Sequence, residues 1–356
     1  MKKVQLKPEE ISTIPIVMDG TYRGVPVARR IAIAMATYNG GRFIEEQIRS
    51  IQLQSHSDWM LYIRDDASKD DTVLKILQIE CKDSRVKLVR DKLGNQGAIG
   101  NFSTLMEVAL EENAEYLFFA DQDDVWQPDK LTIMLGAMEE LELKYGEQTP
   151  LLVHCDLSVV NETLQPIAHS FVKYSRLSPT SAELGVLLCQ NQVTGCACAI
   201  NRTLLELACP VPRNALMHDW WLALLASSAG KIGFIPQPLV MYRQHAGNVL
   251  GAVSLGRRLK ELLFSLRQWK LRMEVVRGGF VQAAMLEERI KARGIELLPY
   301  IQKQIHTYSQ ILDVSPFKRV SKLHAQKIGR SASSTRLVYN LLITALRRKQ
   351  EAKTVA

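Results

Sequence analysis

Two carboxylates one residue apart, Asp121 and Asp123, follow a short apolar run at residues 116–120. At the end of a buried strand, where the backbone turns, both side chains can reach one point in space. A hard divalent cation such as Mg²⁺ or Mn²⁺ binds carboxylate and phosphate oxygens together. An isolated Asp-x-Asp is most often a solvated acidic turn. Its position at a strand end favours a metal site that also holds a phosphate.

A second group of polar residues follows two other apolar runs. Asp66 follows the run at residues 60–63, after Arg64 and Asp65, and either caps the next helix or accepts hydrogen bonds from a nucleobase imide or a ribose hydroxyl. Asn95 and Gly97 follow the run at residues 86–89. With Gly100 and Asn101 they form a stretch of small residues over which a sugar nucleotide can lie closely.

Two further candidates lie far downstream, in His218–Trp221 and Tyr242–His245. Asp219 is either a helix cap or a general base whose pKa a tryptophan wall can tune. His245 is either a structural histidine or an imidazole ligand beside the aspartate metal site.

The elements that position these residues alternate along the chain. Apolar runs at residues 31–36, 60–63, 86–89 and 116–120 predict strands, and helical spacing between them predicts helices, the second of which is capped by Ser68. This alternation indicates a mostly parallel sheet with helices on both faces, and ligands bind outside the carboxyl ends of such strands. The polar clusters at residues 37–41, 65–71 and 121–124 should therefore meet at one edge.

The pattern is mixed beyond residue 150. Strands are predicted at residues 151–155, 196–200 and 232–235, the last ending before a turn at Pro236 and Pro238, with a helix near residues 220–226. We expect residues 1–29 to form a leader, 30–250 the main domain and 251–356 a helical extension.

The extension is strongly basic. Residues 250–356 hold 21 Lys and Arg against 7 Asp and Glu, whereas residues 1–249 hold 24 against 30. Leu259, Leu262, Leu263, Leu266, Trp269 and Met273 recur at helical spacing between basic residues, which predicts an amphipathic helix. Further helices are predicted near residues 280–292, 298–312 and 332–348. The apolar stripe either binds an anionic membrane surface or packs against the main domain or a second subunit.

The composition excludes several classes of protein. No apolar stretch reaches 18 residues and no apolar run follows the N-terminal lysines, so neither a membrane-spanning segment nor a secretory signal is expected. The six cysteines form no disulfide framework or zinc pattern, and Cys81, Cys155, Cys189 and Cys209 should be buried thiols. These features are typical of a cytoplasmic protein.

With these residues assembled, the sequence resembles the inverting family-2 glycosyltransferases of the GT-A fold over about residues 30–250. The motifs occur in the family's order and spacing: ATYNG (36–40), RDDASKDDT (64–72), NQGAIGNF (95–102), ADQDDVWQPDKL (120–131), TGCACAINR (194–202) and HDWW (218–221). The DQDDVW and YRQH features are most similar to bacterial rhamnosyltransferases and related polysaccharide enzymes, including those of lipopolysaccharide synthesis.

The resemblance implies roles for individual residues. Asp121 and Asp123 would hold Mg²⁺ or Mn²⁺ and the donor diphosphate, with Asp123 the more direct ligand, and Asp219 would be the catalytic base. The other donor-binding residues would be Thr37, Tyr38, Asn39, Asp66, Asn95, Gly97 and Gly195. The family often has an arginine after the loop that contains Asn95, where this sequence has Gly100.

The expected function is transfer of a sugar, with rhamnose as one candidate, from a nucleotide-diphosphate donor to a glycan or lipid-linked glycan. We expect a cytoplasmic enzyme, peripheral on the inner face of the cell membrane, with no nucleic-acid partner. One alternative is a sugar nucleotidyltransferase, although the TYNGGRF loop is a poor triphosphate loop. Another is a nucleic-acid binder driven by the basic extension.

Overall fold

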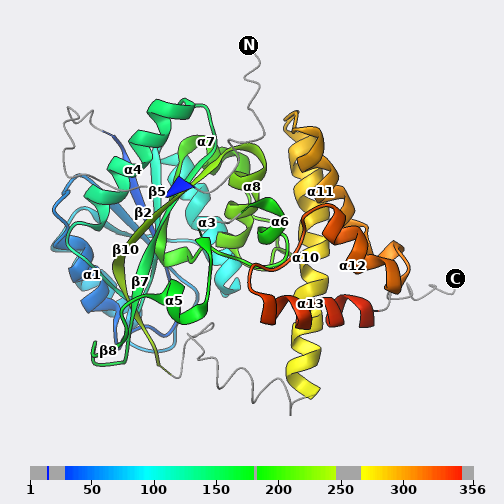
Figure 1. The fold of residues 1–356 in the computed structure, drawn as a ribbon. Coiled ribbons are helices and arrows are strands. Elements are labelled where there is room, and N and C mark those ends of the chain that lie inside the picture. Colours follow the sequence, from blue (N-terminus) through cyan, green and yellow to red (C-terminus); the bar gives the residue numbers. More distant parts are fainter. Residues whose placement is uncertain (1–13, 16–28, 180–182, 246–265, 347–356) are drawn as a thin grey trace, which may run out of the picture.

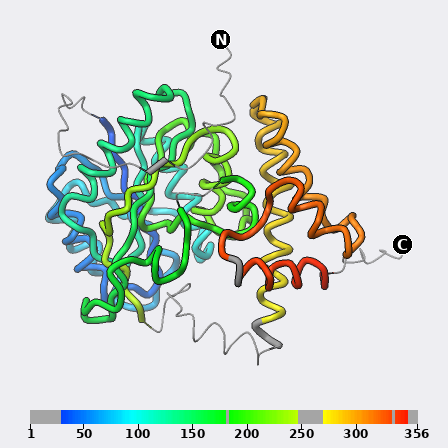
Figure 2. Tube along the Cα trace, viewed as in Figure 1, coloured from blue at the N-terminus to red at the C-terminus, as the bar shows by residue number. Residues whose placement is uncertain are grey.

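A computed structural model describes residues 14–15, 29–179, 183–245 and 266–346. A twisted sheet flanked by helices occupies residues 29–245, and a group of helices stands to one side of it (Figure 1). The Cα trace shows the same two regions side by side (Figure 2).

The central sheet has the strand order β1-β10-β7-β9-β5-β2-β3-β4. All described strands on this path run parallel except β9, which is antiparallel to both of its neighbours. Two short strands, β6 and β8, pair outside the path with β10 and β7. The strand bounds are β1 (Ile14–Pro15), β2 (Ile31–Thr37), β3 (Met60–Asp65), β4 (Val86–Leu88), β5 (Tyr116–Asp121), β6 (Val125–Trp126), β7 (Leu151–Val160), β8 (Pro166–Ala168), β9 (Cys198–Asn201) and β10 (Lys231–Arg243).

Helices cover both faces of the sheet because successive strand residues point to opposite sides. On β2, Ile33 and Met35 belong to a core shared with α1, α2 and α4, whereas Ala32 and Ala34 belong to a second core shared with α3, α7 and α8. The helices are α1 (Ile44–Gln52), α2 (Thr72–Glu80), α3 (Gly97–Glu111), α4 (Lys130–Tyr145), α5 (Phe171–Ser175), α6 (Leu184–Leu187), η3 (Gly195–Ala197), α7 (Arg202–Ala208) and α8 (His218–Ala229).

The C-terminal helices extend this second core. Val276, Phe280 and Leu286 of α10 are buried in the same cluster as Leu188 and Trp221. The partly buried Trp269 and Met273 also pack against it. The elements of this region are α10 (Leu266–Ala292), α11 (Pro299–Ser309), η4 (Ile311–Asp313), α12 (Pro316–Ala325) and α13 (Ser333–Ala345).

The predicted α/β class, with its mostly parallel sheet and helical extension, is confirmed, but several boundaries are wrong. β10 does not end before Pro236 and continues to Arg243, because register shifts on either side of Pro238 accommodate residues that cannot donate a ladder hydrogen bond. α12 was not predicted. The first residues of the predicted basic helix lie outside the described residues, and its described part is continuous with α10.

Smaller corrections concern helix starts and one thiol. α3 begins at Gly97, so Gly97, Gly100 and Asn101 lie in a helix and not in a loop. Ser68 does not cap α2, because its hydroxyl donates to Asp65. Cys81 is exposed, although the other five cysteines are buried.

Across the described part of the chain, no helix combines the length and apolar character that crossing a bilayer requires.

Candidate active site

The polar ends of three parallel strands meet at one edge of the sheet. Thr37 at the end of β2 pairs in register with Asp65 of β3, and Ala36 pairs with Asp121 of β5. Arg243 ends β10, which runs parallel to β7 on the other side of β9. The convergence predicted from alternating elements is therefore present, since parallel strands that share a register also share a C-terminal edge.

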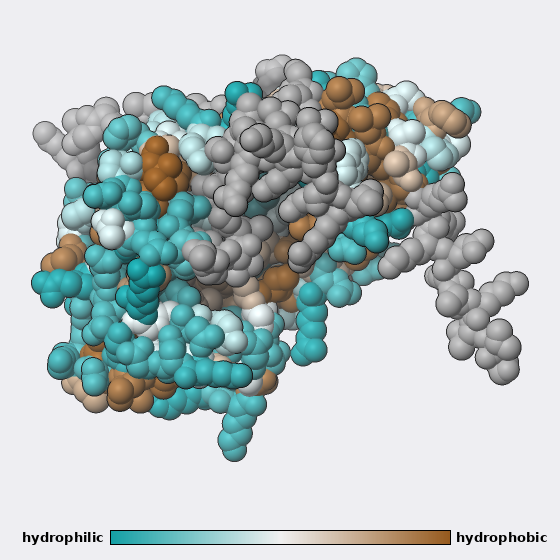
Figure 3. Space-filling view, turned by 90° about the horizontal axis from the view of Figure 1, so that it is seen from below, coloured by the Kyte–Doolittle hydropathy of each residue, from teal (hydrophilic) through white to brown (hydrophobic). Residues whose placement is uncertain are grey.

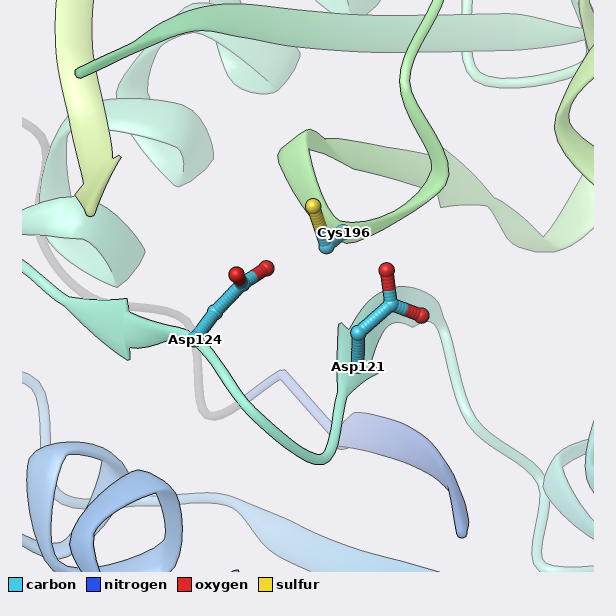
Figure 4. Close-up of side chains that lie close together, drawn as sticks. All are labelled: Asp121, Asp124 and Cys196. Carbon is cyan, nitrogen blue, oxygen red and sulfur yellow. The ribbon is translucent and has the colours of Figure 1, made fainter. Parts of the chain in front are cut away.

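An acid cluster lies just beyond β5. Carboxylate oxygens of Asp121 and Asp124 and the Cys196 sulfur lie within 4.8 Å of one another, converging from the β5–β6 turn and from η3 (Figure 4). Burial, with the nearby charges of Asp123 and Asp219, raises the pKa of Asp121 to about 7. Burial also raises the pKa of Asp124, whose Oδ2 has no hydrogen-bond partner among the described residues. These carboxylates repel each other, and a cation would relieve the repulsion.

Two of the three predicted metal ligands, Asp123 and His245, are close together. His245 Nε2 lies 2.7 Å from Asp123 Oδ2, and both side chains are mostly buried. The His245 ring also packs against the Phe43 ring, with 4.9 Å between the ring centroids. The two residues are 122 positions apart in the chain. The turn after β5 and the end of β10 therefore present one carboxylate–imidazole pair.

Arg243 fixes the turn that carries these carboxylates. Its backbone N–H donates to Asp124 Oδ1 (3.0 Å) and its Nε to the Asp123 carbonyl (2.7 Å). Its two terminal nitrogens donate to the Glu162 carbonyl and the Glu46 carboxylate. The guanidinium is almost completely buried and lies over the Phe43 ring. This arginine thus ties the acid turn to α1 and to the β7–β8 turn.

Gln122, between the two predicted ligands, joins the ends of β5 and β2. Its Oε1 accepts hydrogen bonds from the Thr37 hydroxyl and from the Tyr38 N–H, and its Nε2 donates to the Tyr38 carbonyl. A Cβ at Gly40 would lie 2.1 Å from Gln122 Oε1, so this contact requires glycine there. The Tyr38 side chain is exposed to solvent, whereas the Thr37 hydroxyl is already hydrogen-bonded to Gln122.

Hydrogen bonds of Asn39 connect the loop after β2 with the loop after β3. Asn39 adopts a positive φ of 49°, which asparagine tolerates better than most residues. Its side-chain oxygen accepts from the Lys69 N–H, and its own N–H donates to the Ser68 hydroxyl. The Asn39 side chain therefore joins the loops after β2 and β3.

Asp66 is buried and binds the start of α3. Its Oδ1 accepts from the Gln96 N–H (2.6 Å) and from Arg64 (2.9 Å), and its Oδ2 accepts from the Gly97 N–H (2.8 Å). Asn95 donates to the Asp66 carbonyl. Asp66 thus satisfies the free N–H groups at a helix N-terminus, but of α3 and not of the next helix, as the cap interpretation supposed.

Asp219 lies at the start of α8 and is held by several donors. Its Oδ2 accepts from the Gly195 N–H (2.9 Å), and its Oδ1 accepts from Asn191 Nδ2 (3.0 Å) and from the Trp220 N–H (2.6 Å). It is not the N-cap, which is Met217. Burial raises its pKa to about 7 in spite of these bonds. A carboxylate with such a pKa can accept a proton near neutral pH.

Comparison with known proteins identifies the domain. Residues 32–145 match the model of Glycosyl transferase family 2. Residues 32–145 carry a family-2 glycosyltransferase domain. The family and fold drawn from the sequence motifs are thereby confirmed, and a solved structure of GalNAc-T7 with UDP, GalNAc and Mn²⁺ shares the GT-A fold. That structure has a TM-score of 0.51 at 13% identity and covers 79% of this chain and 57% of its own.

The chain is also similar to curated bacterial glycosyltransferases. The chain is 28% identical over 245 residues to the dTDP-rhamnosyl transferase RfbG of Shigella flexneri, covering 66% of this chain and 80% of the relative. It is 32% identical over 118 residues to the UDP-Glc:alpha-D-GlcNAc-diphosphoundecaprenol beta-1,3-glucosyltransferase WfgD of Escherichia coli. That second match covers 33% of this chain and 44% of the relative.

Several residues around the glycosyltransferase site escaped the sequence interpretation. Asp124 stands next to the predicted ligand Asp123, so the run of acids itself was a signal. Lys130 is fully buried, and its Nζ donates to the Cys196 carbonyl (2.7 Å) and lies over the Trp126 ring. Burial lowers the pKa of Lys130 to about 8. Lys130 lies within the motif at residues 120–131, whereas no sequence signal marks Asn191.

Proposed function

We propose that this glycosyltransferase uses a divalent metal and inverts the anomeric centre of a nucleotide-diphosphate-sugar as it transfers the sugar to a hydroxyl group. The observation that carries the proposal is that the Gly195 N–H donates to Asp219, while the next residue, Cys196, lies in the acid cluster with Asp121 and Asp124. An acid cluster of a kind that can hold a metal and a buried carboxylate whose pKa is raised to about 7 therefore lie close together at this edge of the sheet.

The residues present fit a hard divalent cation. Asp121, Asp123 and His245 offer oxygen and nitrogen ligands, and the unpartnered buried oxygen of Asp124 is explained by a cation nearby. Bound Mg²⁺ or Mn²⁺ would neutralise the negative charge of the departing diphosphate. Nitrogen from His245 favours Mn²⁺ over Mg²⁺, whose ligands are almost all oxygens.

The donor nucleotide is proposed to lie over the ends of β2 and β3. Tyr38 offers an exposed ring for stacking, and Thr37 and Asn39 shape the turn beneath it. Asp66, Asn95 and Gly97 would form the base and ribose side. Oδ2 of Asp66 accepts one hydrogen bond among the described residues, from the Gly97 N–H, and a carboxylate oxygen can accept a second.

Asp219 is proposed as the general base. Its carboxylate would take the proton from the acceptor hydroxyl while the acceptor oxygen bonds to the anomeric carbon and the bond to the diphosphate oxygen breaks. Attack from the face opposite the leaving group inverts the anomeric centre. Gly195, whose N–H already holds Asp219, would border the transferred sugar.

The biological setting is proposed from the relatives. Their names support a glycan or a lipid-linked glycan as acceptor in cell-surface polysaccharide synthesis, with rhamnose as one candidate sugar. A lipid-linked acceptor would place the protein on the inner face of the cell membrane. The family match favours this function over the sugar nucleotidyltransferase alternative.

A panel of nucleotide-sugars tests the proposal. Purified protein is incubated with each donor and with acceptor glycolipid, with Mn²⁺ or with chelator, and released nucleoside diphosphate is measured. We expect release from one donor in the presence of metal and its loss in chelator. Release that ignores chelator, or pyrophosphate release from a nucleoside triphosphate and a sugar phosphate, would overturn the proposal.

A further inference from the structure

Apolar side chains remain exposed where α10 begins and along α13. They are Leu271 and Val275 on α10 and Leu337 and Leu341 on α13, and α13 packs against α10. We call these four residues with Arg336 the lower helical surface. Seen from below, brown side chains gather over this helical region (Figure 3). We propose that the lower helical surface binds an anionic phospholipid membrane.

Helix α13 is apolar on two sides. Tyr339, Leu342 and Ile343 face inward and are buried in the common core. Leu337 and Leu341, one turn apart, face outward and are 65% and 55% exposed. A helix on the surface of a soluble protein usually presents polar residues on its outer side. The outer leucines of α13 therefore offer an apolar strip to a partner that is itself apolar.

Charge indicates what that partner is. Residues 314–346 contain no Asp or Glu and six basic residues, which are Lys318, Arg319, Lys322, Lys327, Arg330 and Arg336. Arg319 is buried against backbone carbonyls, and the others lie at or near the surface. Lys270 and Arg272 outnumber Glu274 in the first turns of α10. Exposed apolar side chains on helices that carry an excess of basic residues match the acyl boundary and headgroups of an anionic bilayer.

The same charge argues against a second copy as the partner. Two lower helical surfaces brought face to face would place basic side chains against basic side chains, which repel. An anionic headgroup layer instead attracts each of them. The observations thus favour a lipid surface over self-association.

The orientation fits the proposed function, on which this part of the inference rests. The C-terminal end of β10, which belongs to the catalytic edge, lies at the bottom of the view, as do the first turns of α10 and helix α13 (Figure 1). A membrane against the lower helical surface would therefore face the catalytic edge. A lipid-linked acceptor could reach Asp219 from that membrane.

Vesicle co-sedimentation of the full chain tests the inference independently of catalysis. The vesicles are phosphatidylcholine alone or an equal mixture of phosphatidylcholine and phosphatidylglycerol. We expect sedimentation with the mixture, weakened by salt, and little with phosphatidylcholine. The double variant Leu337→Ser/Leu341→Ser should bind at least about tenfold more weakly, because two leucines that would enter the membrane are removed from the contact. Arg336→Glu, which reverses one charge and removes hydrogen bonds to the Arg330 and Ser331 carbonyls, should also weaken binding.

The matched control is Leu143→Ser, at an 89% exposed leucine near the C-terminal end of α4. This variant should sediment like the wild type. Nucleoside diphosphate release with a water-soluble acceptor should be unchanged in the double variant, so failure of membrane binding is distinguishable from failure of the proposed transfer. Equal sedimentation of double variant and wild type would overturn the inference. So would a wild-type dimer that the double variant converts to monomer, because the partner would then be a second copy.

Discussion

At the scale of single residues, the acid turn concentrates negative charge that the protein alone does not balance. Asp121, Asp123 and Asp124 lie within four positions, and the buried Lys130 donates its Nζ to the carbonyl of Cys196 in η3 and not to one of these carboxylates. Arg243 bonds the backbone of Asp123 and one oxygen of Asp124. The charge left over is what a divalent cation would neutralise.

Asp123→Ala should therefore abolish metal-dependent transfer and leave the fold intact, because Asp123 lies in a turn and not in the core. We expect the Mn²⁺ dependence of nucleoside diphosphate release to disappear with activity, while the thermal midpoint changes little. Asp129→Ala, at an exposed aspartate with no capping bond, is the control and should retain activity. Normal turnover of Asp123→Ala in chelator would contradict the metal site.

Asp219→Asn keeps the size of the side chain but removes the proton acceptor. We expect near-normal donor binding and a fall in turnover of roughly 10²–10⁴, the usual contribution of a general base. If donor affinity collapses while turnover is preserved, Asp219 is a binding residue. Donor titration followed by tryptophan fluorescence separates the two results.

The pH profile gives an independent test of the same carboxylate. Burial raises the pKa of Asp219 to about 7, so the ionised, working form is lost as pH falls through that value. Wild-type kcat/KM should fall about tenfold per pH unit below it. The residual activity of Asp219→Asn should not show this fall at acidic pH. If the fall persists unchanged in the variant, it is caused by the titration of another group.

At the scale of elements, η3 and α8 pack closely because Gly195 of η3 has no side chain. A Cβ at Gly195 would lie 2.8 Å from His218 Nε2, on a buried ring stacked against Phe102. Burial lowers the pKa of His218 to about 3, so the ring is neutral at working pH. The ring has little room to move, and the Gly195 N–H holds Asp219.

Gly195→Ala should therefore displace Asp219 and lower turnover by roughly a hundredfold, the cost of misplacing a reacting group by about 1 Å. Gly329→Ala is the matched control, because a Cβ there meets no atom within 4 Å. Steady-state rates and thermal midpoints of both variants should be compared. Full activity of Gly195→Ala would show that η3 and α8 are not coupled in this way.

The sequence predicted the sheet edge well because buried parallel strands are continuous apolar runs whose polar ends are easy to locate. It placed Asp121, Asp123 and His245 in one metal site, and His245 does lie against Asp123. It did not predict the hydrogen bonds of Gln122 to the end of β2 or those of Arg243 to the acid turn, since these join residues 85 and 120 positions apart. The path of β10 through its two prolines depends on pairing with β7, which no local pattern reports.

At the scale of the whole molecule, one core joins the glycosyltransferase domain to the C-terminal helices. Phe280 of α10 packs edge-on against Tyr308 (5.0 Å between ring centroids) and shares a cluster with Trp221. The sequence left open whether the extension packs on the main domain. The apolar stripe of the predicted basic helix indicates that this helix packs against something. It does not indicate which surface covers it, and only the fold identifies that surface.

Phe280→Ala should destabilise the protein by about 3–5 kcal/mol and lower the midpoint of the whole molecule in one transition. Urea unfolding followed by tryptophan fluorescence and by helical circular dichroism should give coincident curves. Leu143→Ala, on an exposed site, should change the free energy of unfolding by less than about 0.5 kcal/mol. Two separate transitions, with only the helical signal shifted, would contradict a common core.

The central claim, metal-dependent transfer with inversion, is tested most directly by proton NMR of the anomeric signals during turnover of the accepted nucleotide-sugar. The account predicts that, with Mn²⁺, the donor signal gives way to a glycoside signal of opposite anomeric configuration. The same sample in chelator, or with Asp219→Asn, should show almost no conversion. A product that retains the donor configuration, or conversion unaffected by chelator, would contradict it.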